Sequence, residues 1–172
     1  LTVTAKSEVA KMGANTLAQR TEENQLKFDN YREQFRRLNK ALANGFNLEA
    51  MFIEYAIMED RTESILRHAD LWEAYLKKRG NRGPTINSKI SYIQGKVNSG
   101  DKLLTKYFAD DLLDQVLIWK EERNRLIHAL LKQQFEHNEI SELAAKGNEL
   151  VKALRSKSGS YNRAVEKAKA PK

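Results

Sequence analysis

The spacing of apolar residues is the feature that most constrains the fold of this chain. Along most of its length, apolar side chains recur every three or four residues, which places them on one face of an α-helix. No sustained alternation of β-branched and polar residues indicates a strand, and both prolines, Pro84 and Pro171, lie outside the periodic stretches. A chain of 172 residues has the length of one domain with a sizeable core. The pattern predicts a single all-α domain, an antiparallel bundle of about five helices.

Capping residues and glycines predict the bounds of the first two helices. The first should span residues 21–43, with Thr21 as its N-cap and Asn44-Gly45 as its stop. The second should span residues 47–79, with Gly80 as its C-cap. At 1.5 Å per residue this helix would be about 50 Å long, so we expect part of its apolar stripe to be buried against a second copy of the chain.

Three shorter helices should follow a basic, glycine-rich loop. One spans residues 86–98, after which comes a short turn at residues 103–108. The next starts after Asp111, with Asp114 completing a cap-like pair, and ends at His137-Asn138. The last covers residues 140–154. The predicted organisation is an N-terminal segment (residues 1–20), a helical domain (21–157) and a basic C-terminal tail (158–172) of weak helical tendency.

Positive charge is concentrated in two segments. The formal net charge is +7, whereas residues 77–106 carry eight basic and one acidic side chain and residues 152–172 carry seven and one. The densest group, which we call the basic cluster, consists of Lys77, Lys78, Arg79 and Arg82. Such a cluster can attract a phosphate backbone or can be an ordinary solvated loop, and charge alone supports both interpretations equally.

Several classes of site are disfavoured by what the sequence lacks. Without cysteine there is no disulfide or thiolate metal site, and none of the three histidines pairs with another at metal-ligand spacing. No apolar run approaches the roughly 18 residues of a membrane span. We therefore expect a cytoplasmic protein that binds no metal or other cofactor and no membrane.

The stretch "LLDQVLIWKEERNRLIHALLKQQ", residues 112–134, raises the main functional question. Arg123 and Asn124 interrupt two apolar rows on its predicted buried side, and His128 lies one turn after Asn124. Arg123 lies about 140° around the helix from His128, so the two can border one cleft. The rows are Leu112, Val116, Trp119, Arg123, Leu126, Leu130, and Leu113, Leu117, Lys120, Asn124, Ile127, Leu131.

A buried guanidinium needs compensation, and two kinds are possible here. In the first, Arg123 pairs internally with a carboxylate such as Glu59 or Asp60 and serves as a structural anchor. In the second, the cluster binds phosphate, because arginine suits bidentate oxyanion contacts and histidine exchanges protons near neutral pH.

The residues "RNRLIH", Arg123 to His128, resemble the R-x4-6-H motif of the HEPN superfamily, including the polar residue that often follows the arginine. Many members of this superfamily of small helical domains are metal-independent endoribonucleases in toxin–antitoxin, abortive-infection and RNA-targeting CRISPR systems. The resemblance implies a homodimer formed through the motif helix, a composite cleft between the two copies, RNA as substrate and a possible cognate antitoxin.

A second stretch, "RTESILRH" from Arg61 to His68, also fits this spacing. Glu54, Glu63 and Arg67 nearby indicate ordinary pairing along a helix surface, so we interpret His68 as structural or exposed. The instance at Arg123 is favoured by Asn124 and by the interrupted rows.

RNA cleavage by its own 2′-hydroxyl requires a base, an acid and cations around the phosphorus. We expect His128 to transfer protons, Arg123 to stabilise the phosphate and Asn124 to orient either of them. Glu59 and Asp60 are candidate supports behind these residues, and the basic cluster of Lys77, Lys78, Arg79 and Arg82 is the candidate contact for the RNA backbone.

Two other functional classes fit the same sequence. The chief alternative is a non-catalytic helical dimer that acts as a scaffold or binds a partner protein or nucleotide. A DNA-binding module has the necessary charge but no recognisable helix-turn-helix signature.

Overall fold

The computed structural model describes residues 22, 25–132 and 136–170, and the regular structure within these ranges is helical, without a strand. The all-α prediction is therefore confirmed for this part of the chain. Two compact units are present, residues 1–40 and residues 41–172. The helix of the first unit is described from residue 25 and continues to residue 43, so its predicted end is confirmed, whereas the predicted N-cap Thr21 lies outside the described residues.

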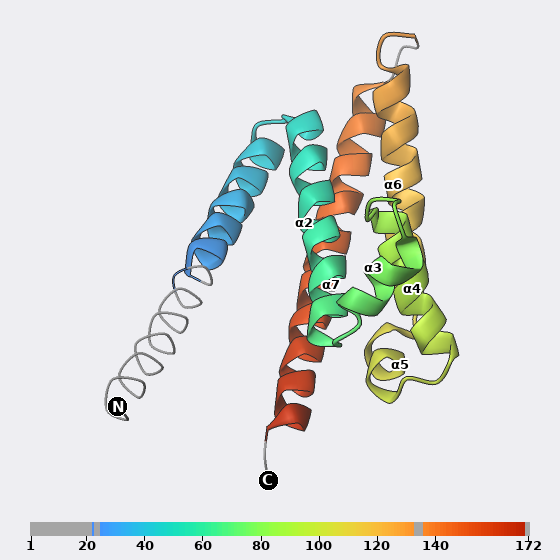
Figure 1. Cartoon of the computed structure of the whole chain (residues 1–172). Coiled ribbons are helices and arrows are strands. Elements are labelled where there is room, and N and C mark those ends of the chain that lie inside the picture. The colour runs from blue at the N-terminus through green and yellow to red at the C-terminus, as the bar shows by residue number, and fades with distance from the viewer. Residues whose placement is uncertain (1–21, 23–24, 133–135, 171–172) are drawn as a thin grey trace, which may run out of the picture. The chain divides into compact units, whose positions relative to one another are not determined.

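The second unit contains more helices than the sequence predicted. The predicted helix at residues 47–79 is in fact two helices, and the expected turn at residues 103–108 is helical as well. The helices (Figure 1) are α2 (Asn47–His68), α3 (Trp72–Arg79), α4 (Ile86–Asn98), α5 (Lys102–Phe108), α6 (Leu112–Ala129) and α7 (His137–Lys169).

Helix α2 ends because Asp70 adopts a left-handed backbone conformation, with φ of 56°. The amide of Asp70 donates to the Arg67 carbonyl over 3.1 Å, and the amide of Leu71 donates to the Leu66 carbonyl over 2.9 Å. This is the hydrogen-bond pattern of a Schellman motif, in which aspartate occupies the position usually taken by glycine. The prediction of one continuous helix over residues 47–79 is therefore wrong.

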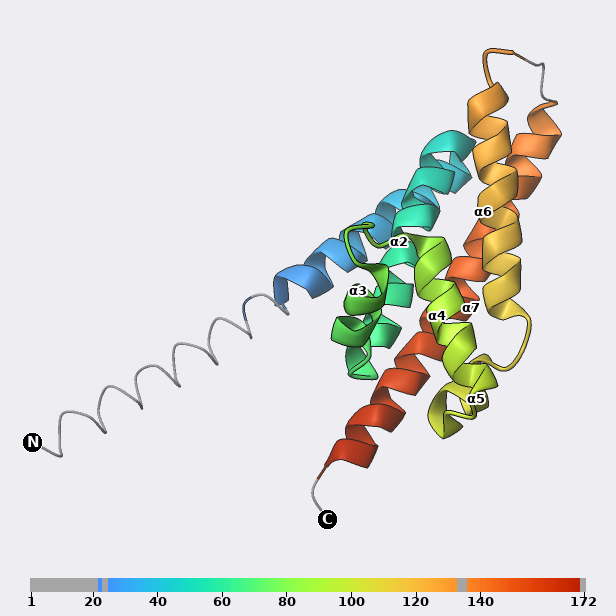
Figure 2. The same ribbon diagram turned by 45° about the vertical axis from the view of Figure 1, so that its right-hand side comes forward.

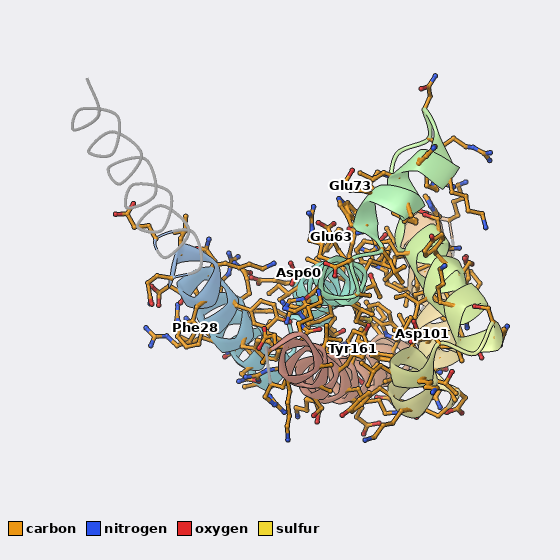
Figure 3. All side chains as sticks on the ribbon, turned by 60° about the horizontal axis from the view of Figure 1, so that its bottom comes forward. Phe28, Asp60, Glu63, Glu73, Asp101 and Tyr161 are labelled. Atoms are coloured by element: carbon orange, nitrogen blue, oxygen red, sulfur yellow. The ribbon has the colours of Figure 1, made fainter. Side chains whose placement is uncertain are left out.

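The longest helix of the second unit is α7, with 33 residues. The sequence prediction ended this helix at residue 154 and placed a basic tail at residues 158–172, but α7 continues through "SKSGS" to Lys169. Tertiary packing overrides the weak local propensity. Tyr161, which is labelled in Figure 3, is 2% exposed. Its ring lies 6.0 Å from that of Tyr107 and 5.6 Å from that of Phe108.

The connection between α6 and α7 also differs from the prediction. Helix α6 begins after Asp111 as expected, but the Asp111 carboxylate accepts a hydrogen bond from Gln115 Nε2 instead of capping the helix amides. Helix α6 ends at Ala129, earlier than predicted. His137 begins α7 instead of ending α6, because Glu136 and Glu139 form a capping box around the start of α7.

Helices α2, α7 and α6 of the second unit lie side by side, with α7 between the other two in Figure 1 (see also Figure 2). Helix α6 is antiparallel to α7, since Trp119 Nε1 donates to the Leu143 carbonyl over 2.9 Å and Lys157 pairs with Asp110. Helices α2 and α7 are parallel. Their later parts meet where Asn162 donates to Ser64 Oγ over 3.1 Å, and their earlier parts meet at Glu54 and Gly147. The prediction of an antiparallel bundle is therefore wrong for this pair.

The early part of α4 packs against α2 and α3, whereas α5 lies at the end of α4, where Thr105 Oγ1 donates to the Val97 carbonyl over 3.2 Å. Lys89 of α4 is 3% exposed, and its Nζ lies 3.3 Å from Glu63 Oε2 and 3.6 Å from Glu59 Oε1 on α2. Tyr75 of α3 is 1% exposed and its hydroxyl lies 2.7 Å from Ser88 Oγ of α4. These contacts fix the ends of α3 and α4 relative to α2, which positions the basic cluster.

Candidate functional site

Packing against α7 buries one apolar row of α6 almost completely. Leu112, Val116, Trp119 and Leu126 are each at most 6% exposed. Arg123, in the same row, is half-buried, so the arginine marks the edge of the buried face. In the second row the exposure of the side chains increases along the chain, from buried Leu113 to fully exposed Leu131. The expectation that both rows are buried therefore holds within this chain only for these four residues of the first row, since Leu130 at its end is half-buried.

Arg123 lies against two aromatic rings of α2. Its guanidinium carbon is 4.6 Å from the centroid of the Phe52 ring and 5.0 Å from that of the Tyr55 ring. Its Nη1 donates to Asn124 Oδ1 over 3.1 Å, and its Nε is buried without a hydrogen-bond partner among the described residues. Burial lowers the pKa of Arg123, and Tyr55 opposes this shift. The guanidinium is still charged at neutral pH, because arginine does not deprotonate in proteins.

The predicted internal ion pair is absent from the described residues. Glu59 lies 3.6 Å from Lys89 Nζ, and Asp60 pairs with Arg61. Burial raises the pKa of the Tyr55 hydroxyl, Glu59 raises it further and Arg123 lowers it, so Glu59 shares the electrostatic surroundings of Arg123. Within the described residues Glu59 thus pairs with Lys89 and Asp60 with Arg61, and neither forms an ion pair with Arg123.

His128 is exposed, one turn beyond half-buried Asn124. Asn124 is held by its hydrogen bond from Arg123 and so connects the arginine to the turn that carries the histidine. Along α6, His128 is about 7.5 Å further than Arg123 and about 140° around the axis. One chain thus presents the arginine in a sheltered position and the histidine in an open one.

The histidine of the second motif-like stretch contacts other residues of the chain. His68 Nδ1 lies 2.9 Å from the Ser64 carbonyl, and its Nε2 lies 3.6 Å from Glu166 Oε1 of α7. His68 is therefore held by contacts within the chain, and its interpretation as a structural residue stays a prediction. The same interpretation placed Glu54 on the helix surface, and this is wrong, because Glu54 is 0% exposed.

The basic cluster lies at the end of α3 and in the loop that follows. Lys78, Arg79 and Arg82 line a pocket of about 450 Å³, whereas Lys77 does not line it. Arg79 Nη2 donates to the Gly83 carbonyl over 2.8 Å and so supports the loop. Sequence reasoning missed the other lining residues, whose signal would have been the hydroxyl-rich start of α4: Tyr75, Thr85, Asn87, Ser88, Ser91 and Tyr92.

The pocket lies near the motif helix. Lys120 Nζ donates to Glu121 Oε1 over 2.6 Å, and this hydrogen bond is the main cause that lowers the pKa of the Glu121 carboxyl on α6, while the Asn87 side chain lowers it to a smaller extent. Asn87 lines the pocket, and Glu121 precedes Arg123 by two residues. The pocket and Arg123 therefore lie on neighbouring parts of one unit, although no ion pair or hydrogen bond joins the cluster to Arg123, Asn124 or His128 within the described ranges.

The described residues contain no group of three or more histidine, aspartate or glutamate side chains arranged to hold a metal ion. In the same part of the chain, no helix combines the length and the apolar character needed to cross a bilayer. Comparison with protein-family models, with curated proteins and with solved structures gives no match to this chain. The functional argument therefore depends on the geometry of its own residues.

Proposed function

We propose that this protein is a metal-independent endoribonuclease of the HEPN type, which cleaves RNA at a composite site formed by two copies of the chain. The observation that carries the proposal is the state of Arg123. It is half-buried and charged, it is oriented by Asn124 and two aromatic rings, and it has no carboxylate partner among the described residues.

A purely structural arginine in this position would be expected to have an anion beside it, because desolvating a charge without a partner is costly. Here the rings of Phe52 and Tyr55 offset part of that cost. The remaining donors of the fork-shaped guanidinium match two oxygens of a phosphate. Arg123 therefore has the surroundings of a residue prepared for a phosphate ligand.

The chemistry assigned to the site is transesterification. The 2′-oxygen of the RNA attacks the adjacent phosphorus while a base removes its proton, and the bond to the 5′-oxygen breaks as an acid donates a proton to it. The products are a 2′,3′-cyclic phosphate and a free 5′-hydroxyl. Each chain supplies one His128, so two copies related by a two-fold axis supply the base and the acid, with both Arg123 side chains stabilising the phosphorane.

A role as a toxin or in defence against phage or stress, and control by a cognate antitoxin, are parts of the proposal that follow from the family resemblance. The proposed setting is the cytoplasm, where RNA substrates are available.

The deciding experiment incubates the purified protein with mixed RNAs in EDTA. Wild-type protein should cleave, and the products should carry a 2′,3′-cyclic phosphate. His128→Ala and Arg123→Ala should each reduce the rate by roughly 10²-fold or more. The matched control is Arg125→Ala, because Arg125 is an exposed arginine on the same helix that faces Glu122 and Lys146. It should retain near-normal activity. A substrate with a single 2′-deoxy sugar at the cut site should resist cleavage.

The same samples distinguish the nuclease from a structural scaffold. Since Arg123 has no carboxylate partner, Arg123→Ala should change the free energy of unfolding by no more than about 1 kcal/mol, the size of an exposed cation–π contact. An arginine that anchors a buried ion pair would cost about 3–5 kcal/mol when removed. Wild-type protein that cuts no RNA, together with an Arg123→Ala variant that is strongly destabilised, would show that the arginine is a scaffold residue.

A further inference from the structure

The pocket between the end of α3 and the start of α4 has a size and lining suited to a small polar ligand. Its volume of about 450 Å³ lies within the roughly 300–1,000 Å³ typical of ligand pockets. Its charged lining residues are all basic, namely Lys78, Arg79 and Arg82. The field inside the pocket therefore favours an anion.

One of these cations is fixed in place before any ligand binds. Arg79 is half-buried, and its Nη2 is held by the Gly83 carbonyl. Its Nε is buried and has no hydrogen-bond partner among the described residues. The guanidinium of Arg79 therefore contributes a fixed positive charge to the pocket lining, whereas Lys78 and Arg82, both exposed, can close on an oxyanion from solvent.

An aromatic ring stands beside these cations. Tyr92 is half-buried, and its ring lies edge-to-face with that of Tyr75 at 5.6 Å. Tyr75 is itself fixed by its hydroxyl contact with Ser88 at 2.7 Å. The cations next to this ring are Lys78 and Lys96, whose Nζ atoms lie 5.6 Å and 5.7 Å from its centroid. An aromatic ring beside positive charge is the combination that proteins use to stack a nucleobase beside its phosphate.

Uncharged donors and acceptors complete the lining. Thr85 and Ser88 are occupied by the capping box of α4, so they contribute mainly to its shape. Asn87 and Ser91 are exposed and also line the pocket. They are placed to hydrogen-bond a ribose hydroxyl or a base edge.

We propose that this pocket binds one nucleotide unit of single-stranded RNA, with its phosphate on Lys78, Arg79 and Arg82 and its base against Tyr92. The identity of the strand rests on the proposed nuclease function, because the pocket would then hold the RNA that is cut at Arg123 and His128. The nucleotide-binding chemistry itself depends only on the pocket.

The test measures binding by calorimetry, at low salt, of 5′-AMP, ribose 5-phosphate and adenosine to the full chain. Base–aromatic stacking of about 1–3 kcal/mol corresponds to roughly 5- to 150-fold in affinity, so AMP should bind tighter than ribose 5-phosphate by that factor. Tyr92→Leu should lower the AMP affinity to that of ribose 5-phosphate, and Tyr92→Phe should keep it. Arg82→Gln and Lys78→Gln should weaken both phosphate-bearing ligands, with adenosine unaffected.

Lys77→Gln is the matched control, since Lys77 is an exposed lysine beside Lys78 that does not line the pocket. It should leave AMP binding unchanged. The proposal is overturned if AMP and ribose 5-phosphate bind equally, if nothing binds, or if Lys77→Gln and Lys78→Gln weaken AMP to the same extent.

A second measurement distinguishes a nucleotide within an RNA strand from a free nucleotide as the ligand. In the His128→Ala background, which should not cut, single-stranded RNA should displace AMP, and failure to displace it would show a site for free nucleotides instead of a strand. None of these measurements involves cleavage. AMP binding without any nuclease activity would therefore contradict the proposed function but support nucleotide binding by the pocket. Cleavage without AMP binding would contradict nucleotide binding by the pocket alone.

Discussion

Glu54 is an acidic side chain in the middle of the α2–α6–α7 contact. It is 0% exposed, and neither carboxyl oxygen has a hydrogen-bond partner among the described residues. Burial raises the pKa of this carboxyl from 4.5 to about 8. A buried acid without a partner is most stable in its neutral form, so at neutral pH the folded protein holds a proton there that the unfolded chain releases.

This difference predicts how stability depends on pH. Below about pH 4.5 both states are protonated and Glu54 costs nothing by ionisation. Between pH 4.5 and about 8 only the unfolded state loses the proton, so stability falls as pH rises, by at most about 1.4 kcal/mol per pH unit. Glu54→Gln should remove this slope. Urea unfolding at pH 5, 6, 7 and 8 should therefore show the variant gaining on the wild type as pH increases, and a constant difference would contradict the buried, neutral acid.

Residue chemistry alone could single out Arg123, Asn124 and His128 as candidate site residues, because polar residues interrupt an apolar row there. It could not identify the burial of Glu54. Its neighbours in sequence, including Glu63 and Arg67, indicate a surface pattern, and only the approach of α7 at Gly147 encloses the carboxyl. The position of a helix that lies about 90 residues further along the chain is not encoded in the local pattern.

At the scale of elements, the turns after the first helix, after α2 and after α4 share the Schellman hydrogen-bond pattern, but the residue in the left-handed position differs among them. Gly45 and Gly100 occupy the left-handed position after the first helix and after α4, with φ of 71° and 86°. Both ends were predicted from the sequence, because glycine adopts this conformation without strain. Asp70 occupies the equivalent position after α2, and its left-handed state gives a weaker local signal than glycine. The Gly-marked ends were therefore predictable and the Asp-marked end was missed.

Two glycines inside α7 offer a test of packing against propensity. A Cβ at Gly147 would lie 2.2 Å from Glu54 Oε2 and 2.8 Å from Trp119 Cε2, whereas at Gly159 the nearest atom is Arg163 Nη1 at 3.6 Å. Gly147→Ala should destabilise by about 1–3 kcal/mol through overpacking. Gly159→Ala should stabilise by about 0.5–1 kcal/mol, because alanine is the better helix former.

Denaturant unfolding of the two variants beside the wild type is the measurement. Opposite signs are expected from the same substitution in the same helix. Stabilisation by Gly147→Ala would mean that α7 does not pack against α2 and α6 as described.

At the scale of the whole molecule, the all-α class followed from periodicity, but the arrangement of the helices did not. The parallel pairing of α2 with α7 depends on contacts between distant residues, such as Asn162 with Ser64 and Lys169 with the His68 carbonyl. Periodicity defines which face of a helix is apolar, but not which other helix covers it or in which direction. The same limit applies to the pocket at α4, whose walls come from separate segments.

Packing within the chain also changes the surface available for a dimer. The first row of α6 is covered by α7, so the proposed interface must use apolar side chains that remain exposed near Arg123. On α2 these are Leu48, 37% exposed, and Phe52, 57% exposed, which lie one turn apart. Leu131, fully exposed, follows the end of α6 and is seven residues beyond Asn124.

We therefore expect a homodimer at micromolar concentration that is held together by this surface. Leu131→Asp and Leu48→Asp should each shift light scattering toward the monomer and reduce RNA cleavage in parallel, because a monomer has only one His128 for a reaction that needs both a base and an acid. The matched control is Ile118→Asp, since Ile118 is 53% exposed on α6 but lies about 120° around the helix from Asn124. It should remain dimeric and active. Wild-type protein that cleaves RNA while it is monomeric would exclude the composite site, and the second proton transfer would then have to be assigned to a group within one chain.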